Sequence, residues 1–325
     1  MEKIKADRAG LTAAGGEAVI TRGVGGKYRL HLGGDHYITA VPRGILRRKQ
    51  QRPLPGDRVI YSWQQDRSDP VLIESVFARQ NLLVRPPLAN VDCLILTVAV
   101  ARPEPDLLLL DKLLVITATA GIDPLICFTK GDLDRSTADR LASFYRLSGY
   151  RTAVTSLTSQ QGLLAALPER SGSGRIIALA GPSGTGKSTL FNALAGSDLM
   201  ATGGVSHKTG RGRHTTRHVE LWATPTGCYL TDTPGFSSLD LAELGIPPED
   251  VVCGYREFMN PATGCRFNTC RHRQEPGCAV TEFVAEQAAC DKALYNHLRE
   301  RLARYRILYE SAAAVPPHIR RQRRR

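Results

Sequence analysis

The chain has 325 residues, of which 42% are hydrophobic and 23% charged, a balance that excludes collagen-like, coiled-coil and wholly disordered proteins. Charged residues interrupt its most apolar region, so no run approaches the roughly 18 residues that a membrane span needs. The first residues lack the apolar stretch of a signal peptide. We therefore expect a soluble cytoplasmic protein of two or three domains that does not associate with membranes.

The formal net charge of +12 is concentrated at the two ends of the chain. Residues 1–78 carry 13 basic and 8 acidic side chains, residues 291–325 carry 10 and 3, and the region between them carries 20 of each. This distribution suits a polyanion such as RNA, held by flanking segments around a neutral centre. A merely solubilising surface is the alternative. The last ten residues fit either a disordered tail or an arm that binds nucleic acid.

Short alternating segments separated by turn residues fill the first 80 residues. They predict strands at 17–22, 28–32, 36–41, 57–63 and 71–77. Five such strands favour a small barrel of the OB type, a fold that binds oligonucleotides. Residues 43–52 hold five basic side chains in ten, which fits either a phosphate-binding loop or a solvated loop.

From residue 92 onward, apolar strands alternate with helical segments. Strands are predicted at 92–99, 124–128, 151–155, 175–180, 217–222 and 227–231. Helices are predicted at 106–120, 134–148, 161–167 and 187–195. This alternation is typical of an α/β domain with a mostly parallel sheet. After about residue 245 the strands stop, and a loop rich in Cys and His leads into helices that end near residue 311.

The strongest motif follows the apolar strand predicted at 175–180 and opens a helix. It fits G-x-x-x-x-G-K-[ST], the phosphate-binding loop of P-loop proteins. Its residues are Gly181, Pro182, Ser183, Gly184, Thr185, Gly186, Lys187, Ser188 and Thr189. In such a cradle the backbone N–H groups and the helix N-terminus surround the phosphates, the lysine reaches the β- and γ-phosphates, and the serine hydroxyl binds Mg²⁺. We therefore predict a nucleoside triphosphate site.

A second motif indicates which base is bound. Thr129-Lys130-Gly-Asp132 follows the buried strand 124–128 and is similar to the guanine motif [NT]-K-x-D. The Asp132 carboxylate would accept hydrogen bonds from N1 and the 2-amino group of guanine, which adenine cannot donate. The Lys130 stem would lie along the base. Ser156, after the next strand, belongs to a weaker version of the motif that contacts the guanine O6.

Two further segments lie downstream of the cradle. Asp232-Thr-Pro-Gly235 fits D-x-x-G, in which Asp232 would hold Mg²⁺ through water and the Gly235 amide would sense the γ-phosphate. Residues 210–216 are rich in Gly and Arg and end in His214, Thr215 and Thr216. Their hydroxyls predict a switch loop that caps the metal. An ordinary long loop is the alternative.

The order of these motifs differs from that of ordinary GTPases, because the base motif precedes the cradle by about 50 residues. The loops of a parallel sheet share one edge, so cutting the chain after D-x-x-G and rejoining it before the base motif preserves the site. The segment after Gly235 then leads directly into the Cys/His region. Nucleotide state could therefore reposition that region.

Three thiols and one imidazole cluster within fourteen residues, at Cys265, Cys270, His272 and Cys278. This donor set is the one that tetrahedral Zn²⁺ takes in a closed structural site. Free thiols gathered by coincidence are the alternative. The following helix carries Arg299, Arg301, Arg304 and Arg306 among apolar residues, which predicts an apolar face directed inward and a basic face directed outward.

These motifs resemble the circularly permuted GTPases required in small ribosomal subunit biogenesis, the ribosome small-subunit-dependent GTPase A family. The likeness spans about residues 15–310. Beyond the motifs it rests on Arg79-Gln-Asn-Leu-Leu-Val-Arg-Pro86, Ala89-Asn-Val-Asp92 and Pro105–Lys112, and the four Cys/His positions match the family's metal motif.

The resemblance implies an OB-fold domain that binds RNA at 1–80 and a circularly permuted P-loop GTPase domain, of the α/β class, at 81–245. A mainly helical zinc-binding domain at 246–312 and a basic tail at 313–325 complete the chain. It further implies GTP/GDP, Mg²⁺ and one structural Zn²⁺ as ligands, and the small ribosomal subunit with its 16S-type rRNA as partner. The expected activity is hydrolysis of GTP to GDP and phosphate by a monomeric late assembly factor, stimulated by the subunit.

One departure bears on the chemistry. Phe236 follows Gly235, where many GTPases place a glutamine that orients the attacking water. Because phenylalanine cannot orient water, we expect slow intrinsic turnover of GTP. We assign the positioning of the attacking water to His214. Two other functions remain open: a small-molecule kinase or ATPase built on the same cradle, and an RNA-binding zinc protein with a vestigial nucleotide site.

Overall fold

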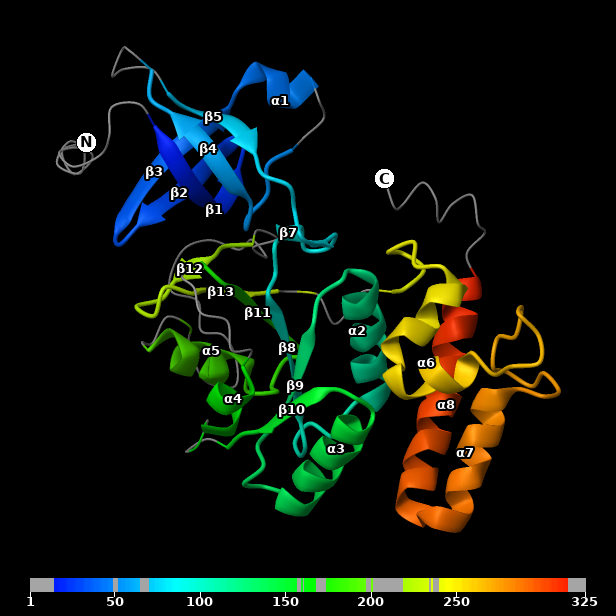
Figure 1. The fold of residues 1–325 in the computed structure, drawn as a ribbon. Coiled ribbons are helices and arrows are strands. Elements are labelled where there is room, and N and C mark those ends of the chain that lie inside the picture. The colour runs from blue at the N-terminus through cyan, green and yellow to red at the C-terminus, as the bar shows by residue number, and fades with distance from the viewer. Residues whose placement is uncertain are drawn as a thin grey trace. The chain divides into compact units, whose positions relative to one another are not determined.

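The computed structural model describes residues 15–48, 52–64, 70–156, 159, 161–167, 174–196, 200, 219–233, 235 and 240–314. The chain forms two compact units. The first contains the described parts of 1–91, 172–177 and 209–234, and the second contains those of 92–171, 178–208 and 235–325. Figure 1 shows the course of the chain and the element labels.

The N-terminal part of the first unit is a closed five-stranded barrel. Its strands are β1 (Gly16–Val24), β2 (Lys27–Gly33), β3 (His36–Pro42), β4 (Arg58–Ser62) and β5 (Val71–Val76), arranged in the order β1-β2-β3-β5-β4. All pairs are antiparallel except β3 and β5, which run parallel. The five predicted strands are confirmed. A short helix, α1 (Gly44–Arg48), begins in the basic segment predicted to be a loop.

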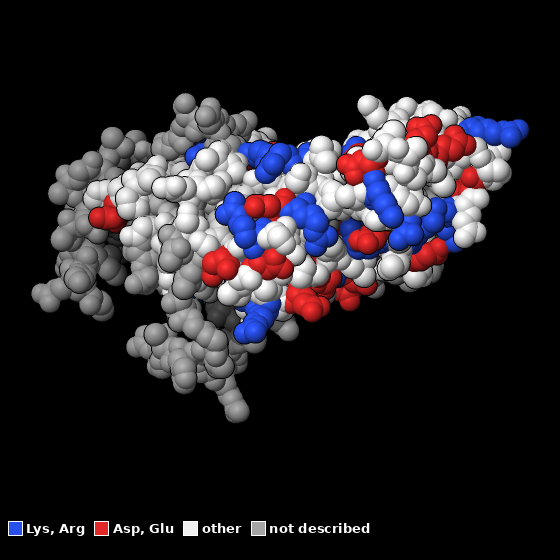
Figure 2. Space-filling model, turned by 90° about the horizontal axis from the view of Figure 1, so that it is seen from below, with Lys and Arg blue, Asp and Glu red and all other residues white. Residues whose placement is uncertain are grey.

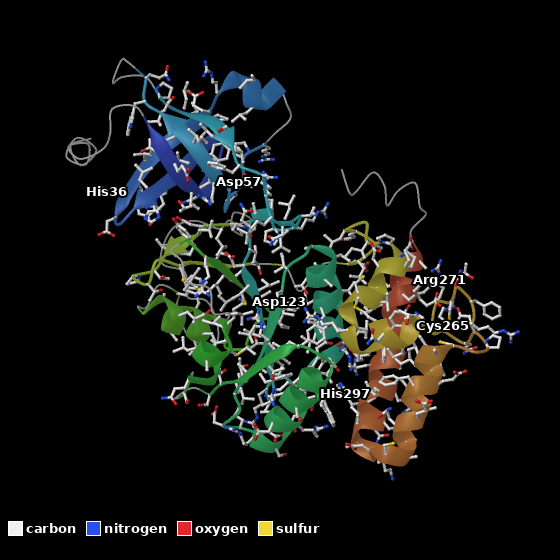
Figure 3. The ribbon with its side chains drawn as sticks, viewed as in Figure 1. His36, Asp57, Asp123, Cys265, Arg271 and His297 are labelled. Carbon is white, nitrogen blue, oxygen red and sulfur yellow. The ribbon has the colours of Figure 1, made fainter. Side chains whose placement is uncertain are left out.

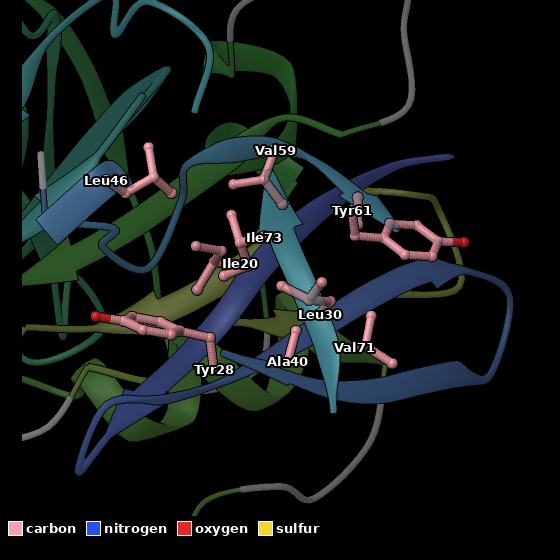
Figure 4. Close-up of a cluster of buried hydrophobic side chains, with 10 residues drawn as sticks. Ile20, Tyr28, Leu30, Ala40, Leu46, Val59, Tyr61, Val71 and Ile73 are labelled. Atoms are coloured by element: carbon pink, nitrogen blue, oxygen red, sulfur yellow. The ribbon is translucent and has the colours of Figure 1, made fainter. Parts of the chain in front are cut away.

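Alternating apolar side chains fill the barrel. Ile20, Leu30, Val59 and Ile73 come from four different strands and are fully buried (Figure 4). Their alternation with exposed residues is the period of two that a strand with one buried face requires. Leu46 of α1 joins the same core. The apolar alternation in the sequence therefore determines the inner face of the barrel.

Residues 77–91 follow the barrel and are fixed to it by polar contacts. Arg79 donates to both carboxylate oxygens of Asp57, at 2.8 and 2.9 Å, and the Asp57 side chain is fully buried (Figure 3). A short hairpin of β6 (Leu82–Leu83) and β7 (Leu88–Ala89) follows. The buried carboxylate is thus paired in the bidentate geometry that makes such burial tolerable.

The α/β region contains one six-stranded sheet, in the order β10-β9-β8-β11-β13-β12. The strands are β8 (Cys93–Ala99), β9 (Pro124–Thr129), β10 (Arg151–Val154), β11 (Ile176–Ala180), β12 (Trp222–Ala223) and β13 (Tyr229–Asp232). β8, β9 and β10 run parallel, and every residue of β8 and β9 is buried. Such burial is typical of a parallel sheet covered on both faces. Of the strand predicted at 217–222, residues 217 and 218 lie outside the described residues, and among the others only Trp222 belongs to β12.

Four helices accompany this sheet: α2 (Leu107–Thr119), α3 (Arg135–Leu147), α4 (Gln161–Ala166) and α5 (Lys187–Ala195). Aspartates begin two of them. Asp106 accepts from the backbone N–H of Leu109, and Asp134 accepts from that of Thr137, which satisfies amides that helix starts leave unpaired. All four helices lie within the segments predicted to be helical.

The C-terminal region is helical, as predicted. It contains a 3₁₀ turn, η3 (Pro248–Gly254), followed by α6 (Arg256–Ala262), α7 (Ala279–Cys290) and α8 (Lys292–Ala313). Both η3 and α8 pack against α2 of the same unit, and α7 packs along α8 (Figure 1). Within the described part of the chain, no helix combines the length and apolar character that crossing a bilayer requires. On the face drawn in Figure 2, basic and acidic side chains of the described residues are interspersed.

Candidate nucleotide and metal sites

The predicted phosphate cradle is a loop between the buried strand β11 and α5. Gly186 precedes the first helical residue, Lys187, with a φ of 81°, a left-handed conformation that favours glycine. Ser183 and Gly184 are exposed, and Lys187 and Ser188 are half-buried. The strand, loop and helix therefore stand in the order that a phosphate cradle requires.

The guanine motif lies directly against this cradle. Thr129 is the last residue of β9, is 3% exposed, and donates its hydroxyl hydrogen to the carbonyl oxygen of Thr185 at 2.7 Å. Both residues belong to the second unit. The structure thus brings together two motifs whose order in the chain is reversed, as the permutation predicts. Asp132, three residues beyond Thr129, is exposed.

Backbone hydrogen bonds connect the base motif to the loop after the next strand. The N–H of Gly131 donates to the carbonyl of Thr155 at 2.9 Å, and the N–H of Thr155 donates to that of Phe128 at 2.9 Å. Ser156 follows and is half-buried. The two loops assigned to the guanine therefore lie side by side at the carboxyl ends of β9 and β10.

A third loop at this edge was not part of any motif. Lys130, at a φ of 58°, donates its ammonium group to the carbonyl oxygen of Arg102, in the loop between β8 and α2. The contact directs the Lys130 side chain across the edge of the sheet. A backbone carbonyl carries no sequence signal, so the pattern of residues could not have indicated this acceptor.

The remaining predicted residues fall into two groups. Asp232 ends β13 in the first unit and is half-buried, and Gly235 is described in the second unit with a φ of 76°. His214, Thr215 and Thr216 lie outside the described residues, as does the rest of the predicted switch loop. Their roles stay predictions.

The hairpin that leads to Asp232 is bound to the barrel within the first unit. The N–H of Leu221 donates to the carbonyl of Thr21 on β1 at 2.9 Å. The Tyr229 hydroxyl lies 2.6 Å from Nδ1 of the buried His31, and its burial raises the pKa of Tyr229 to about 12. The strand that carries Asp232 is therefore held by a barrel side chain, a contact between residues far apart in the sequence.

The Cys/His cluster has the geometry of a metal centre. Nδ1 of His272 lies 3.5 Å from Sγ of Cys265 and 3.6 Å from Sγ of both Cys270 and Cys278, in the loop between α6 and α7 (Figure 3). All four ligand atoms lie within 4.8 Å of one another. Bond lengths of about 2.3 Å for sulfur and 2.0–2.1 Å for nitrogen place the nitrogen about 3.6 Å from each sulfur around a tetrahedral Zn²⁺. The residues therefore fit one zinc ion.

Burial keeps the imidazole in the form that binds metal. It lowers the pKa of His272, so the ring is neutral at physiological pH. The loop is further fixed by Glu275, whose carboxylate accepts from the backbone N–H groups of Arg271, Arg273 and Gln274. Although burial raises the pKa of Glu275, these amides outweigh it and lower the pKa to about 2.

A buried ion network joins the C-terminal helices to α2. The Arg301 side chain is completely buried and donates to the carboxylates of Asp111 and Glu257, and its Nη2 also donates to the carbonyl of Gly254 at 3.2 Å. These partners lie on α2, α6 and η3. Arg301 therefore connects the segment after D-x-x-G to the α/β region.

The Asp111 carboxylate accepts hydrogen bonds from two more side chains. The hydroxyl of Tyr145 lies 2.8 Å from it, and Nε of Arg304 lies 2.6 Å away. The ring of Tyr255 packs 4.6 Å from the Arg301 guanidinium. The predicted outward basic face of α8 is therefore wrong for Arg301 and in part for Arg304, because their charges are neutralised by acids distant in the sequence.

In this protein the guanine motif comes before the phosphate cradle in the sequence, yet both lie at one edge of the same sheet. This combination defines the class of circularly permuted P-loop GTPases. The sequence model of the RsgA GTPase family matches residues 76–242. The chain belongs to this family.

Similar proteins agree with this assignment. "Small ribosomal subunit biogenesis GTPase RsgA" of Ruminiclostridium cellulolyticum is 39% identical over 301 residues, 92% of this chain and 95% of that protein. The protein of the same name from Moorella thermoacetica is 40% identical over 302 residues, 89% and 99% of the two chains. The crystal structure of YloQ, a circularly permuted GTPase, has a TM-score of 0.70 and 31% identity, covering 92% of this chain and 98% of its own. YjeQ from Thermotoga maritima has the same TM-score with 27% identity, covering 93% and 100%.

Proposed function

We propose that this protein hydrolyses GTP to GDP and phosphate as an assembly factor of the small ribosomal subunit. The observation that carries the proposal is the hydrogen bond from Thr129 to Thr185, because it assembles a guanine motif and a phosphate cradle into one site. The relatives named as small ribosomal subunit biogenesis GTPases support the biological setting.

The cradle binds the phosphates. The backbone N–H groups of residues 183–186 and the start of α5 face the anionic oxygens, and the Lys187 ammonium neutralises the β- and γ-phosphates. Ser188 and Asp232 would hold Mg²⁺, and the ion would supply positive charge that stabilises the transferring phosphoryl group. Gly235 offers its amide to the γ-phosphate.

Asp132 selects the base. Its exposed carboxylate accepts from two donors that guanine has and adenine lacks. The stem of Lys130, whose ammonium group binds the carbonyl of Arg102, would lie along the face of the base, and the Ser156 loop would approach the O6 atom. Binding of ATP would leave the carboxylate without those donors, so the site discriminates against adenine.

Hydrolysis depends on residues of the predicted switch loop. Phe236 cannot orient water, and His214 takes that role, while Thr215 and Thr216 cap the metal. Completion of such a site by a partner is worth roughly 10³–10⁵ in rate. Turnover is therefore slow in the free protein and rises on the subunit. If His214→Ala leaves subunit-stimulated hydrolysis intact while Asp132→Ala abolishes GTP binding, the assignment of His214 is wrong.

Docking on the subunit uses the basic ends of the chain. The OB-like barrel of residues 1–80, the zinc-binding domain of residues 246–312 and the tail of residues 313–325 contact 16S-type rRNA, with a single structural Zn²⁺ at the Cys/His cluster. The protein acts as a monomer in the cytoplasm, where subunits are assembled, and late in that assembly.

The decisive experiment measures GTP and ATP hydrolysis with and without isolated small subunits, at two salt concentrations. We expect weak ATP turnover and GTP turnover that rises on adding subunits and falls back in high salt, because phosphate contacts are lost there. Lys187→Ala, which removes the ammonium group that neutralises the phosphates, serves as the negative control. Equal turnover of ATP, or a phosphorylated metabolite as product, would establish the kinase alternative. Undiminished subunit assembly with Lys187→Ala would establish a vestigial site.

A further inference from the structure

Thr97 is a polar residue in the centre of an apolar strand and belongs to none of the motifs. It lies on β8, is 1% exposed, and its neighbours Leu96 and Val98 are buried apolar residues. A hydroxyl in such a place destabilises the fold unless it is hydrogen-bonded. Its partners therefore indicate why it is there.

Both partners of the Thr97 hydroxyl belong to the cradle or to the strand that enters it. Oγ1 of Thr97 lies 2.8 Å from Oγ1 of Thr185 and 3.2 Å from the carbonyl oxygen of Ala180. Ala180 is the last residue of β11, and Thr185 lies just before the helix. One buried hydroxyl therefore touches the two ends of the phosphate loop.

The loop also packs against Thr97 at its first glycine. A Cβ atom placed on Gly181 would stand 2.1 Å from Oγ1 and 2.6 Å from the backbone oxygen of Thr97. Such distances are impossible for real side chains, so only glycine can lie there. The first residue of the phosphate loop is thus packed directly against Thr97.

Two hydroxyl hydrogens serve three contacts at this point of the loop. When the Thr185 hydroxyl donates to the carbonyl of Pro182 at 2.9 Å, its oxygen accepts from Thr97. When Thr97 instead donates to the carbonyl of Ala180, its own oxygen accepts from Thr185. In both arrangements the two hydroxyls are hydrogen-bonded to each other, so Thr97 supports the loop at Thr185.

We propose that Thr97 is a positioning residue, which holds the phosphate-binding loop in the conformation that binds the diphosphate part of the nucleotide. The inference rests on the proposed nucleotide site. Thr185 is held at two points, its hydroxyl by Thr97 and its carbonyl by Thr129. Because the cradle binds phosphates through backbone N–H groups of fixed direction, loss of one support weakens GDP and GTP equally. The choice of base, made by Asp132, stays unchanged.

The test compares Thr97→Ala with Thr97→Ser in the full-length protein, since these two variants differ only in the hydroxyl. Affinity for GDP and for a non-hydrolysable GTP analogue is measured by calorimetry, together with kcat and KM. We expect Thr97→Ala to weaken both nucleotides about tenfold, with kcat at saturating GTP and the GTP-to-ATP preference within about twofold of wild type. We expect Thr97→Ser to bind like wild type.

Thr117 provides a matched control. It is fully buried on α2, and its hydroxyl donates to the carbonyl of Leu114 in the same helix rather than to a residue of the cradle. Thr117→Ala should leave nucleotide affinity unchanged. Should Thr97→Ala not fold, Thr97→Val removes the hydroxyl while keeping the branched shape, and the same loss is expected.

The results separate this inference from the proposed function. Wild-type affinity in Thr97→Ala overturns the inference, and so does an equal loss in Thr97→Ser or Thr117→Ala, which would indicate a purely structural effect. A fall in kcat without a change in affinity also overturns it. If the wild-type protein binds neither GDP nor the GTP analogue, the proposed function itself is wrong.

Discussion

The hydroxyl of Thr129 donates to the carbonyl oxygen of Thr185 at 2.7 Å, across 56 positions of the sequence. The motif usually has asparagine at the position of Thr129, and the hydroxyl supplies the one donor that the carbonyl requires. The same hydroxyl also lies 3.3 Å from the carbonyl of Val98 on β8. This side chain therefore connects the base motif and the cradle in a chain whose permutation separates them.

Removing this hydroxyl should weaken nucleotide binding. Thr129→Val leaves the buried carbonyl of Thr185 without its donor, which we expect to reduce GDP affinity about tenfold. Thr129→Asn and Thr129→Ser retain a donor and should stay close to wild type. Calorimetric titration with GDP provides the measurement. Wild-type affinity in Thr129→Val would show that backbone contacts alone hold the two loops together.

Most of the strand and helix positions could be predicted because they depend on local patterns. Alternation in the barrel and continuous apolar runs such as 93–99 indicate the strands, and the shared edge of a parallel sheet indicates that Thr129 lies near the cradle. The environment of Arg301 could not be predicted. Its acid partner Asp111 lies 190 positions earlier, and an arginine bears no local sign of whether it meets solvent or a buried carboxylate.

The metal cluster should determine the folding of its own loop. Because residues 265–278 have little apolar core, removal of Zn²⁺ is expected to unfold this loop while the α/β region stays folded. Hydrogen exchange before and after chelation would show loss of protection confined to the C-terminal region. Cys270→Ser should purify without zinc, whereas Cys290→Ser, which alters an exposed thiol outside the cluster, should retain one ion per chain. Absence of zinc from the wild-type protein would contradict this assignment.

Arg301 should be among the most sensitive positions for stability. Arg301→Met leaves Asp111 and Glu257 buried without their shared cation, and we expect a loss of about 3–5 kcal/mol in the free energy of unfolding. Arg299→Met on the same helix alters an exposed residue, so a change within about 0.5 kcal/mol is expected. Urea titration monitored by circular dichroism compares the two. Similar losses for both variants would mean that the buried network has no special contribution.

Stability should fall in mild acid because of His297, which lies on α8 with its ring stacked on Phe144 of α3 (Figure 3). Burial, with the nearby charges of Arg301, Arg304 and Arg140, lowers the pKa of His297 to about 3. The unfolded chain binds the proton near pH 6.5 and the folded chain does not, so stability is complete above pH 6.5 and declines towards pH 3.

The decline attributable to this ring is at most about 1.4 kcal/mol per pH unit. His297→Phe removes the titrating group and should flatten the dependence of unfolding free energy on pH between 6.5 and 5. His36→Phe, at an exposed position of the barrel, should keep the wild-type slope. Because both variants retain the zinc ligands, acid release of metal contributes equally and cancels in the comparison. An unchanged slope in His297→Phe would show that the ring is protonated in the folded protein.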